Sequence, residues 1–264
     1  MSARPAVLVI AASDSSGGAG LTRDAQTLGE LQVALRCAVT AVTVQTDAQL
    51  RAIHPVPPQI VQAQIRAALD RGVAAIKIGM LGTAATVRAV AESLPPREQV
   101  PIVLDPVLAS SSGGTLLDLE GVQLLRTLLL PRVSVLTPNI PEAAMLLGEI
   151  PAAGGRIDTA SLHMQLQHLL ALGPAAVLIK GGHRAGGDEI IDMLGLPGRP
   201  PLPIASPRVP AQRRGTGCSL SSALAALLAQ GRTLPDACSG AQRYVAESLR
   251  RSAELQIGRT AQPD

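Results

Sequence analysis

The sequence predicts an α/β protein in which a central, mostly parallel sheet has helices on both faces and a small antiparallel edge. Three observations support this fold class. Short apolar runs alternate along the chain with stretches of helical periodicity. The first run, AVLVIAA at 6–12, is apolar throughout, which is typical of a strand buried on both faces of a parallel sheet. With 264 residues, 47% of them hydrophobic, the chain is expected to form a single domain, residues 1–264.

The expected parallel strands share a short apolar or β-branched run that ends at a polar residue or glycine. In chain order they span 6–12, 37–44, 74–78, 101–104, 133–136 and 175–180. Two further strands, 188–194 and 204–209, lie on either side of the proline-rich turn 197–203. These two are expected to pair antiparallel at one edge of the sheet.

The expected helices have apolar residues every three to four positions, and several begin with a recognisable start signal. Thr83 is expected to be an N-cap, and Pro141 and Glu142 lie in the first turn of another helix. In chain order the helices span 22–33, 57–69, 83–93, 119–129, 141–147, 159–172, 219–229 and 235–250.

Composition excludes several classes of function. The chain has no Phe or Trp and one Tyr, and its net charge of +3 comes from scattered arginines, which argues against a nucleic-acid partner. No apolar run approaches the ~18 residues of a membrane span, so no membrane partner is expected. Cys37, Cys218 and Cys238 are odd in number and far apart, which fits a reducing cytoplasm rather than a disulfide framework or a metal site.

Polar and glycine residues gather directly after the expected strands. They are 14–20, Gln45, 77–79, Asp105, 139–142 and 180–182. Ligands of open parallel sheets bind beyond the carboxyl ends of the strands. This pattern therefore predicts an active site at that edge.

The stretch RGTGCSLSS at 214–222 combines a glycine-flanked turn with the start of a helix. Unpaired amides and the helix dipole at such a start form a site for phosphate or a developing anion. The same field is expected to lower the pKa of the Cys218 thiol, so that Cys218 can act as a base or nucleophile. The alternative is a tight turn in which Cys218 is a small buried apolar residue.

Acidic and basic groups at the same edge suggest a nucleotide site. Asp105 and Glu142 are carboxylates of the kind that hold Mg²⁺, and Lys180 can neutralise phosphate charge. In the first loop, Asp24 follows Gly20 by one helical turn and is expected to point back at it. Each residue taken singly also fits a helix cap or a solvated side chain. P-loop, dinucleotide-binding and hydrolase-elbow motifs are absent from the sequence.

Seven segments in fixed order resemble the hydroxymethylpyrimidine/phosphomethylpyrimidine kinases of thiamine biosynthesis, a family of the ribokinase-like superfamily. They are SDSSGGAG (13–20), VQT (44–46), KIGML (77–81), LDPV (104–107), TPNIPEA (137–143), IKGGH (179–183) and RGTGCSLSSALAAL (214–227). The resemblance covers 7–258. It implies a ribokinase-like fold and the phosphorylation, by ATP with Mg²⁺, of 4-amino-5-hydroxymethyl-2-methylpyrimidine and then of its monophosphate.

The resemblance also implies roles for individual residues. For catalysis it implies an anion hole and phosphate contact by Gly215, Thr216, Gly217 and Lys180, with Cys218 as the base. For ATP it implies Asn139, Lys180 and Arg214, and for the metal Asp105 and Glu142. For the pyrimidine it implies Asp24, Gln45, Met80, Gly18, Ala19 and Val107. It further implies a homodimer in the cytoplasm.

Two departures from the family pattern keep alternatives open. Arg214 stands where the family has His, and 109–113 lack the family's Lys, which puts the second phosphorylation in question. A pyridoxal kinase is the enzymatic alternative, since the two activities overlap in this superfamily. A non-catalytic pyrimidine sensor is the other, although the intact GTGC segment, Lys180 and Glu142 argue against it.

Overall fold

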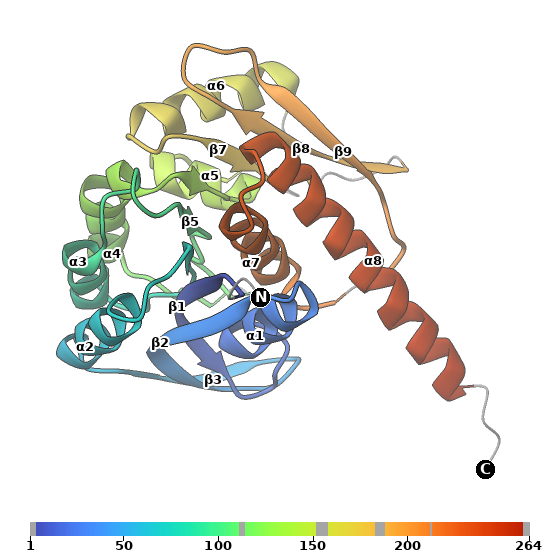
Figure 1. The fold of residues 1–264 in the computed structure, drawn as a ribbon. Helices are drawn as coiled ribbons and strands as arrows, with labels where there is room; N and C mark the ends of the chain where they lie inside the picture. Colours follow the sequence, from blue (N-terminus) through green and yellow to red (C-terminus); the bar gives the residue numbers. More distant parts are fainter. Residues whose placement is uncertain (1–3, 111–113, 152–157, 183–187, 212, 261–264) are drawn as a thin grey trace.

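The structure is a computed structural model and describes residues 4–110, 114–151, 158–182, 188–211 and 213–260. Its described strands form one sheet in the order β3-β2-β1-β4-β5-β6-β7-β8-β9 (Figure 1). The strands are β1 (Ala6–Asp14), β2 (Ala34–Gln45), β3 (Leu50–Pro55), β4 (Ala75–Ile78), β5 (Ile102–Leu104), β6 (Val135–Leu136), β7 (Val177–Ile179), β8 (Glu189–Gly195) and β9 (Leu202–Pro207).

The centre of the sheet is parallel and both edges are antiparallel. Strands β2, β1, β4, β5, β6 and β7 pair in parallel, whereas β3 pairs antiparallel with β2, and β8 and β9 continue antiparallel from β7. The predicted mostly parallel sheet with an antiparallel β8–β9 edge is confirmed. The sequence prediction missed β3, an edge strand that contains Pro55 and whose residues are exposed or half-buried.

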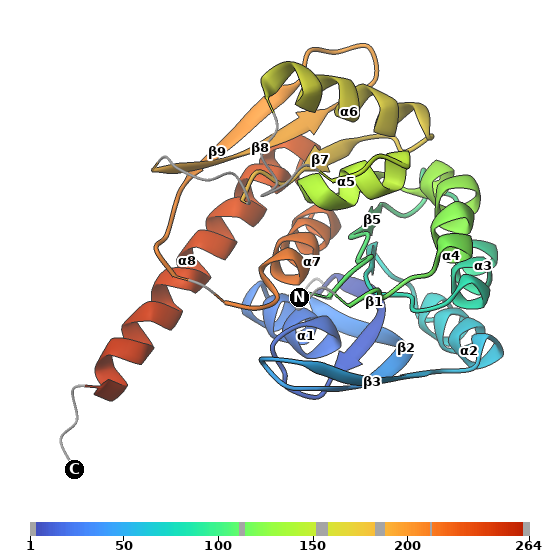
Figure 2. The same ribbon diagram turned by 180° about the vertical axis from the view of Figure 1, so that it is seen from behind.

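Helices cover both faces of the sheet (Figures 1 and 2). They are α1 (Gly20–Glu30), α2 (Pro58–Leu69), α3 (Ala84–Ser93), α4 (Leu119–Leu124), α5 (Ile140–Leu147), α6 (Thr159–Ala171), α7 (Thr216–Ala229) and α8 (Leu234–Thr260). A π-helical turn, Leu125–Leu129, and a 3₁₀ turn, Leu130–Arg132, extend α4. Thr83 caps α3 by accepting a hydrogen bond from the Thr86 amide, as predicted.

Alternate residues of β1 belong to two separate apolar cores. Leu8 and Ile10 pack into a core that includes residues of α2, α3, α5 and α6. Val7 and Val9 face the opposite way, into a core formed with α1, α7 and α8. The continuous apolar run in β1 is therefore explained by burial on both faces.

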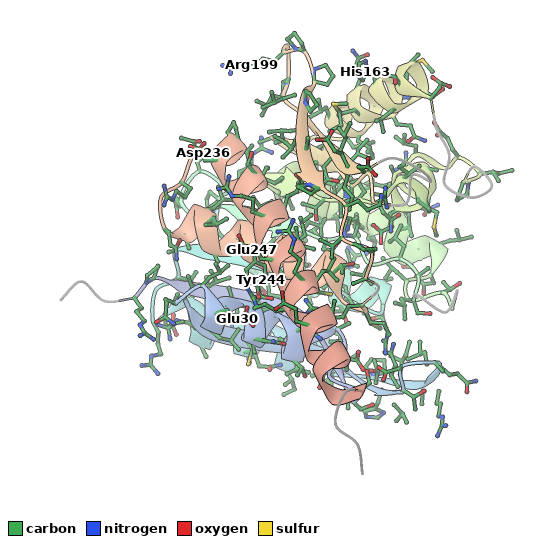
Figure 3. All side chains as sticks on the ribbon, turned by 90° about the vertical axis from the view of Figure 1, so that its right-hand side faces the viewer. Glu30, His163, Arg199, Asp236, Tyr244 and Glu247 are labelled. Atoms are coloured by element: carbon green, nitrogen blue, oxygen red, sulfur yellow. The ribbon has the colours of Figure 1, made fainter. Side chains whose placement is uncertain are left out.

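The long C-terminal helix α8 is tied to α1 by polar contacts. The Tyr244 hydroxyl donates to Glu30 Oε2 at 3.0 Å, and Arg251 donates to the same oxygen at 2.7 Å. Figure 3 shows Tyr244 and Glu30 on neighbouring helices. This contact and the apolar core beneath it hold α1, α7 and α8 as one layer. The amino-terminal ends of α1 and α7 meet, since a Cβ at Gly215 would lie 3.2 Å from Ala19 Cα.

Candidate active site

The candidate site lies at the carboxyl ends of the parallel strands. Asp105 follows β5, Asn139 follows β6 and Lys180 follows β7, so three adjacent strands deliver polar side chains to one edge. The Lys180 amide donates to the Pro138 carbonyl at 2.8 Å, which continues the pairing of β6 and β7 past their last regular residues. This extension sets Lys180 beside the loop that starts α5.

Lys180 joins two carboxylates. Its Nζ lies 2.7 Å from Asp105 Oδ1 and 3.7 Å from Glu142 Oε2. Burial raises the pKa of Glu142 to about 7, with Lys180 opposing the shift and Asp105 adding to it. Burial disfavours the charge of Lys180, but Asp105 and Glu142 together raise its pKa above the ordinary value. The lysine therefore stays positively charged.

A capping box fixes Glu142. Asn139 is the N-cap of α5, and its Oδ1 accepts from the Glu142 amide at 2.8 Å, while Glu142 Oε2 accepts from the Asn139 amide at 2.8 Å. The segment TPNIPEA thus forms a helix start that aims one carboxylate at Lys180. The expected contact of Asn139 with ATP stays a prediction.

Asp105 and Glu142 are chemically suited to Mg²⁺. Mg²⁺ in nucleotide enzymes takes one or two protein carboxylates and completes its octahedron with phosphate oxygens and water. Within the described residues no group of three or more His, Cys, Asp or Glu converges on one point. Asp105 and Glu142 both approach the Lys180 ammonium. Two carboxylates match a metal ion that is carried in by a nucleotide better than a closed structural metal site.

The start of α7 presents free amides to this cluster. Gly215 is the N-cap, and the first intrahelical bond runs from the Ser219 amide to the Gly215 carbonyl. The amides of the three residues between them therefore have no acceptor within the helix. A Cβ at Gly217 would lie only 3.4 Å from Lys180 Nζ and 3.6 Å from Asp105 Oδ2, so the first turn of α7 and the lysine border the same space. The helix begins three residues before the predicted start at residue 219, so this segment is its first turn rather than a preceding turn.

Gly215 is required by its backbone. Its φ of 77° is in the left-handed region, and a Cβ there would collide with the carbonyl oxygen of Gly18. The two glycine-rich segments, 197 positions apart, therefore pack backbone against backbone. This contact brings the first loop to the anion site.

The prediction for the Cys218 thiol is wrong in sign. Burial raises its pKa to about 11, and Asp24 and Asp105 add to the shift, whereas Lys77 and the Gly20 amide oppose it. The loss of hydration outweighs the groups that favour the thiolate. In the absence of ligands the thiol is neutral at pH 7.

Asp24 is fully buried and hydrogen-bonded. Its carboxylate is 0% exposed and accepts hydrogen bonds from Lys77 at 3.0 and 2.8 Å and from Ser222 at 2.7 Å. Without a ligand this carboxylate is therefore occupied by Lys77 and Ser222 rather than open to solvent. Its expected contact with the pyrimidine stays a prediction.

Arg214 faces the first loop instead of the Lys180 cluster. Its guanidinium donates to Ser16 Oγ at 3.0 Å, to the Thr46 carbonyl at 2.9 Å and to Asp14 Oδ2 at 3.3 Å. Asp14 also accepts from the Ala19 amide at 3.0 Å. These bonds place Arg214 on the side expected for the pyrimidine, not among the groups expected to hold ATP.

The other expected pyrimidine contacts lie around this loop. Met80 and Val107 belong to a small aliphatic cluster at the ends of β1, β2 and β4, and the Met80 carbonyl accepts from Thr40 Oγ1 at 2.7 Å. Gln45 is half-buried at the end of β2, where its backbone amide donates to Ser15 Oγ at 2.8 Å. Gly18 lies next to Arg214, since a Cβ there would be 3.4 Å from Arg214 Nη1.

Part of the segment that lacks the family's Lys, 111–113, is outside the described residues.

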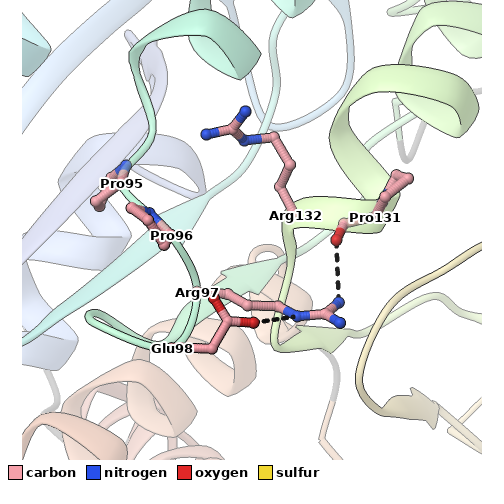
Figure 4. Close-up of a pocket in the computed structure, with 6 residues that line it drawn as sticks. All are labelled: Pro95, Pro96, Arg97, Glu98, Pro131 and Arg132. Atoms are coloured by element: carbon pink, nitrogen blue, oxygen red, sulfur yellow. Dashed lines mark hydrogen bonds and ion pairs between the residues drawn. The ribbon is translucent and has the colours of Figure 1, made fainter.

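A hollow on the molecule lies at the other end of the strands (Figure 4). It is lined by Pro95, Pro96, Arg97, Glu98, Pro131 and Arg132, which precede β5 and β6. Arg97 spans it by donating to the carbonyls of Pro131, Val133 and Gly173 at 2.8–3.3 Å. This hollow is a loop junction closed by an arginine and is separate from the candidate site.

Solved structures with this architecture define the class. Phosphomethylpyrimidine kinase of Clostridium difficile 630 matches with a TM-score of 0.78 at 30% identity, over 93% of this chain and 99% of that one. Pyridoxal kinase of Staphylococcus aureus in complex with AMP-PCP and pyridoxal matches with a TM-score of 0.79 at 28% identity, over 94% of this chain and 88% of that one. The fold is therefore that of a ribokinase-like kinase.

The sequence comparisons identify the family within this class. The protein-family model described as phosphomethylpyrimidine kinase matches residues 14–263 of this chain. A hydroxymethylpyrimidine/phosphomethylpyrimidine kinase of Mycobacterium tuberculosis is 41% identical over 96% of this chain and 91% of that protein. The thiamine biosynthesis bifunctional protein of Geobacter sulfurreducens is 37% identical over 97% of this chain and 51% of that protein. This chain belongs to the phosphomethylpyrimidine kinase family.

Sequence reasoning gave no individual role to three residues near the site, although 77–79 was among the segments expected at this edge. Lys77 binds Asp24, and the adjacent serines Ser221 and Ser222 of α7 donate to Asp105 and Asp24, respectively, at 3.4 and 2.7 Å. One available signal was a lysine inside the otherwise apolar strand AIKI. The serines look like ordinary small residues of a helix, and the sequence contains no comparable signal for them.

Proposed function

We propose that this chain phosphorylates 4-amino-5-hydroxymethyl-2-methylpyrimidine with ATP and then converts the monophosphate to the diphosphate, in thiamine biosynthesis. The family and its named relatives support the reaction. The observation that carries the proposal is the convergence of the free α7 amides on Lys180 and the two carboxylates beside it. Phosphoryl transfer depends mainly on positioning and charge neutralisation, and this arrangement supplies both.

In the proposed reaction, amides of Thr216, Gly217 and Cys218 hold the oxygens of the transferring phosphoryl group. They are preorganised by α7, so no donor has to reorient as negative charge develops. Lys180 is charged and borders the same space, so it contacts the ATP phosphates. Together these groups favour the transition state over the free nucleotide.

The proposal assigns Asp105 and Glu142 to Mg²⁺ that accompanies ATP. When bound there, Mg²⁺ neutralises charge on the phosphates. Glu142 holds the ion as a carboxylate, so metal binding favours loss of the proton that burial retains up to about pH 7.

Cys218 is proposed to take the proton of the substrate hydroxyl. The thiol is neutral in the ligand-free protein, so this step requires prior loss of the thiol proton. Cationic groups near the thiol, Lys77 first among them, favour that loss. Because phosphoryl transfer asks mainly for positioning and charge stabilisation, the base is one contribution among several in the proposed reaction.

Pyridoxal phosphorylation is the second candidate, because pyridoxal kinases are among the similar solved structures. The two substrates are both substituted nitrogen rings with a hydroxymethyl group. The aliphatic cluster around Met80 can pack against either ring. The segments VQT, KIGML and TPNIPEA resemble the pyrimidine kinases and favour the first candidate.

A product assay tests the proposal. The purified chain is incubated with Mg²⁺ and ATP plus the hydroxymethylpyrimidine, its monophosphate or pyridoxal, and the products are separated by ion exchange. We expect pyrimidine monophosphate first and diphosphate later, with kcat/KM for the pyrimidine above that for pyridoxal. The reverse order of kcat/KM would replace this proposal with the pyridoxal kinase.

Lys180→Met is the control for contaminating kinases. It removes the ammonium expected at the ATP phosphates, so its turnover should fall by at least a hundredfold in the same preparation. Product formation equal to that of the wild type would assign the activity to another protein. The proposed homodimer and cytoplasmic location are tested by light scattering and by cell fractionation.

A further inference from the structure

Lys77 lies inside β4, where an apolar residue is expected. Its neighbours Ala75, Ile76 and Ile78 are all fully buried, and Lys77 itself is 0% exposed. Since side chains alternate between the faces of a strand, Lys77 points with Ala75 towards the layer of α1 and α7. Burying an ammonium there is costly unless polar groups surround it.

Two elements of that layer supply the polar groups. Asp24 of α1 binds Lys77 Nζ with both carboxylate oxygens, and Ser222 of α7 donates to Asp24 at 2.7 Å. Gly79 leaves room for the ammonium, because a Cβ at this position would lie 2.9 Å from Nζ. The buried cluster Lys77–Asp24–Ser222 therefore joins β4, α1 and α7 just below the catalytic edge of the sheet.

The cluster lies next to Cys218. Ser222 follows Cys218 by one turn of α7, and side chains four positions apart on a helix are neighbours. The charged groups that act on the thiol are Lys77 from β4, Asp24 from α1, Asp105 after β5 and Lys180 after β7. Among these groups Lys77 acts most strongly and favours the thiolate.

A buried ion pair is weak evidence for a role in stability. Well-packed apolar residues in place of a buried ion pair are often as stabilising or more so. We propose that Lys77 is a positioning residue for phosphoryl transfer: Asp24 holds its ammonium below the first turn of α7, where its charge stabilises the Cys218 thiolate. This role rests on the proposed kinase reaction, in which Cys218 accepts the proton of the substrate hydroxyl.

Alkylation of Cys218 by iodoacetamide tests the role without any substrate. The rate is measured from pH 7 to 10 by peptide mass spectrometry, which separates Cys218 from Cys37 and Cys238. In Lys77→Met we expect the pH profile of Cys218 to move upward by at least one unit, so that alkylation at a given pH is about tenfold slower. In the same variant kcat should fall about tenfold, with KM for ATP within about twofold of the wild type.

Two further variants separate charge from packing. Ser222→Ala removes a hydrogen bond to Asp24 but no charge, so its alkylation profile should stay within about 0.3 units of the wild type. Lys77→Met with Asp24→Asn removes both charges and serves if the single variant does not fold. Its profile should still move upward, because Lys77 acts on the thiol more strongly than Asp24.

An unchanged Cys218 profile in the folded Lys77 variant, or in the double variant if the single one does not fold, would overturn the proposal. A shift in Ser222→Ala as large as that in Lys77→Met would also overturn it, since packing rather than charge would then control the thiol. If the wild type makes no phosphorylated product, the proposed function fails, while the alkylation result still reports whether Lys77 acts on Cys218.

Discussion

At the scale of single residues, the burial of Cys218 determines how the site responds to pH. Its thiol has a pKa of about 11 and is not a thiolate at neutral pH. The loss of hydration outweighs the groups that favour the thiolate, of which Lys77 is the strongest. A base of this kind works through a small thiolate fraction. As long as the pH is below the pKa, this fraction rises about tenfold for each unit of increase in pH.

The first prediction concerns Cys218→Ala. We expect kcat to fall about 10²–10⁴-fold, the usual contribution of a positioned base, with KM for ATP within about twofold of the wild type. Wild-type kcat should rise with pH between 7 and 10, because deprotonation of a thiol with raised pKa increases over this range. The variant should lack this rise. Stopped assays at saturating substrates measure both, and a variant with the wild-type kcat and slope would remove Cys218 from the role of base.

Asp24 shows why some residue roles were predictable and others were not. Its position in the first turns of α1 follows from the sequence pattern, and its proximity to the catalytic edge follows from the fold. Its partner Lys77 lies 53 positions away and is recognisable only when β4 is set between α1 and α7. Whether a carboxylate binds a ligand or a buried lysine depends on such tertiary neighbours.

At the scale of elements, helix starts and strand ends build most of the site. The start of α5 was predictable because Pro141 and Glu142 are strong signals for a first turn, and the structure adds the reciprocal Asn139 cap. The start of α7 was predicted three residues late, since glycine is a poor helix former. Edge strand β3 was missed because it has little burial to produce a clear periodicity.

The second prediction concerns Glu142→Gln in the first turn of α5. Burial raises the pKa of Glu142 from 4.5 to about 7, so the folded protein holds this proton more tightly than the unfolded chain. Wild-type stability should therefore fall as pH rises through this window. Glutamine keeps an acceptor for the Asn139 amide but has no proton to lose. The variant should thus gain melting temperature relative to the wild type from pH 5 to 8, while its Mg²⁺-dependent kcat falls at least tenfold.

Thermal melts without ligand at several pH values measure the effect on stability. Glu120→Gln, at an exposed carboxylate in the first turn of α4, is the matched control and should show no such growing gain. If Glu142→Gln lowers the melting temperature equally at every pH, the capping geometry rather than the buried charge dominates at this position.

At the scale of the whole molecule, the fold brings distant segments together at one edge of the sheet. The clustering of polar residues after strands indicated this edge, because parallel strands share a carboxyl end. The order of the strands is not encoded in any local pattern, and β1, the first strand of the chain, lies inside the sheet between β2 and β4. Arg214 depends on this order, since it binds Ser16 and Thr46 across 198 and 168 positions.

The last prediction follows from these long-range bonds of Arg214. Because its guanidinium links α7 to the first loop and to the turn after β2, Arg214→Ala should loosen the side of the site proposed for the pyrimidine. We expect KM for the pyrimidine to rise about tenfold, the cost of one charged hydrogen bond, with KM for ATP within about twofold of the wild type. Arg214→His introduces the family's usual residue and keeps a hydrogen-bond donor. Its KM for the pyrimidine should lie between those of the wild type and Arg214→Ala. Initial rates with each substrate varied in turn measure both constants. A rise in KM for ATP with no change for the pyrimidine would return Arg214 to the ATP phosphates, where the sequence had placed it.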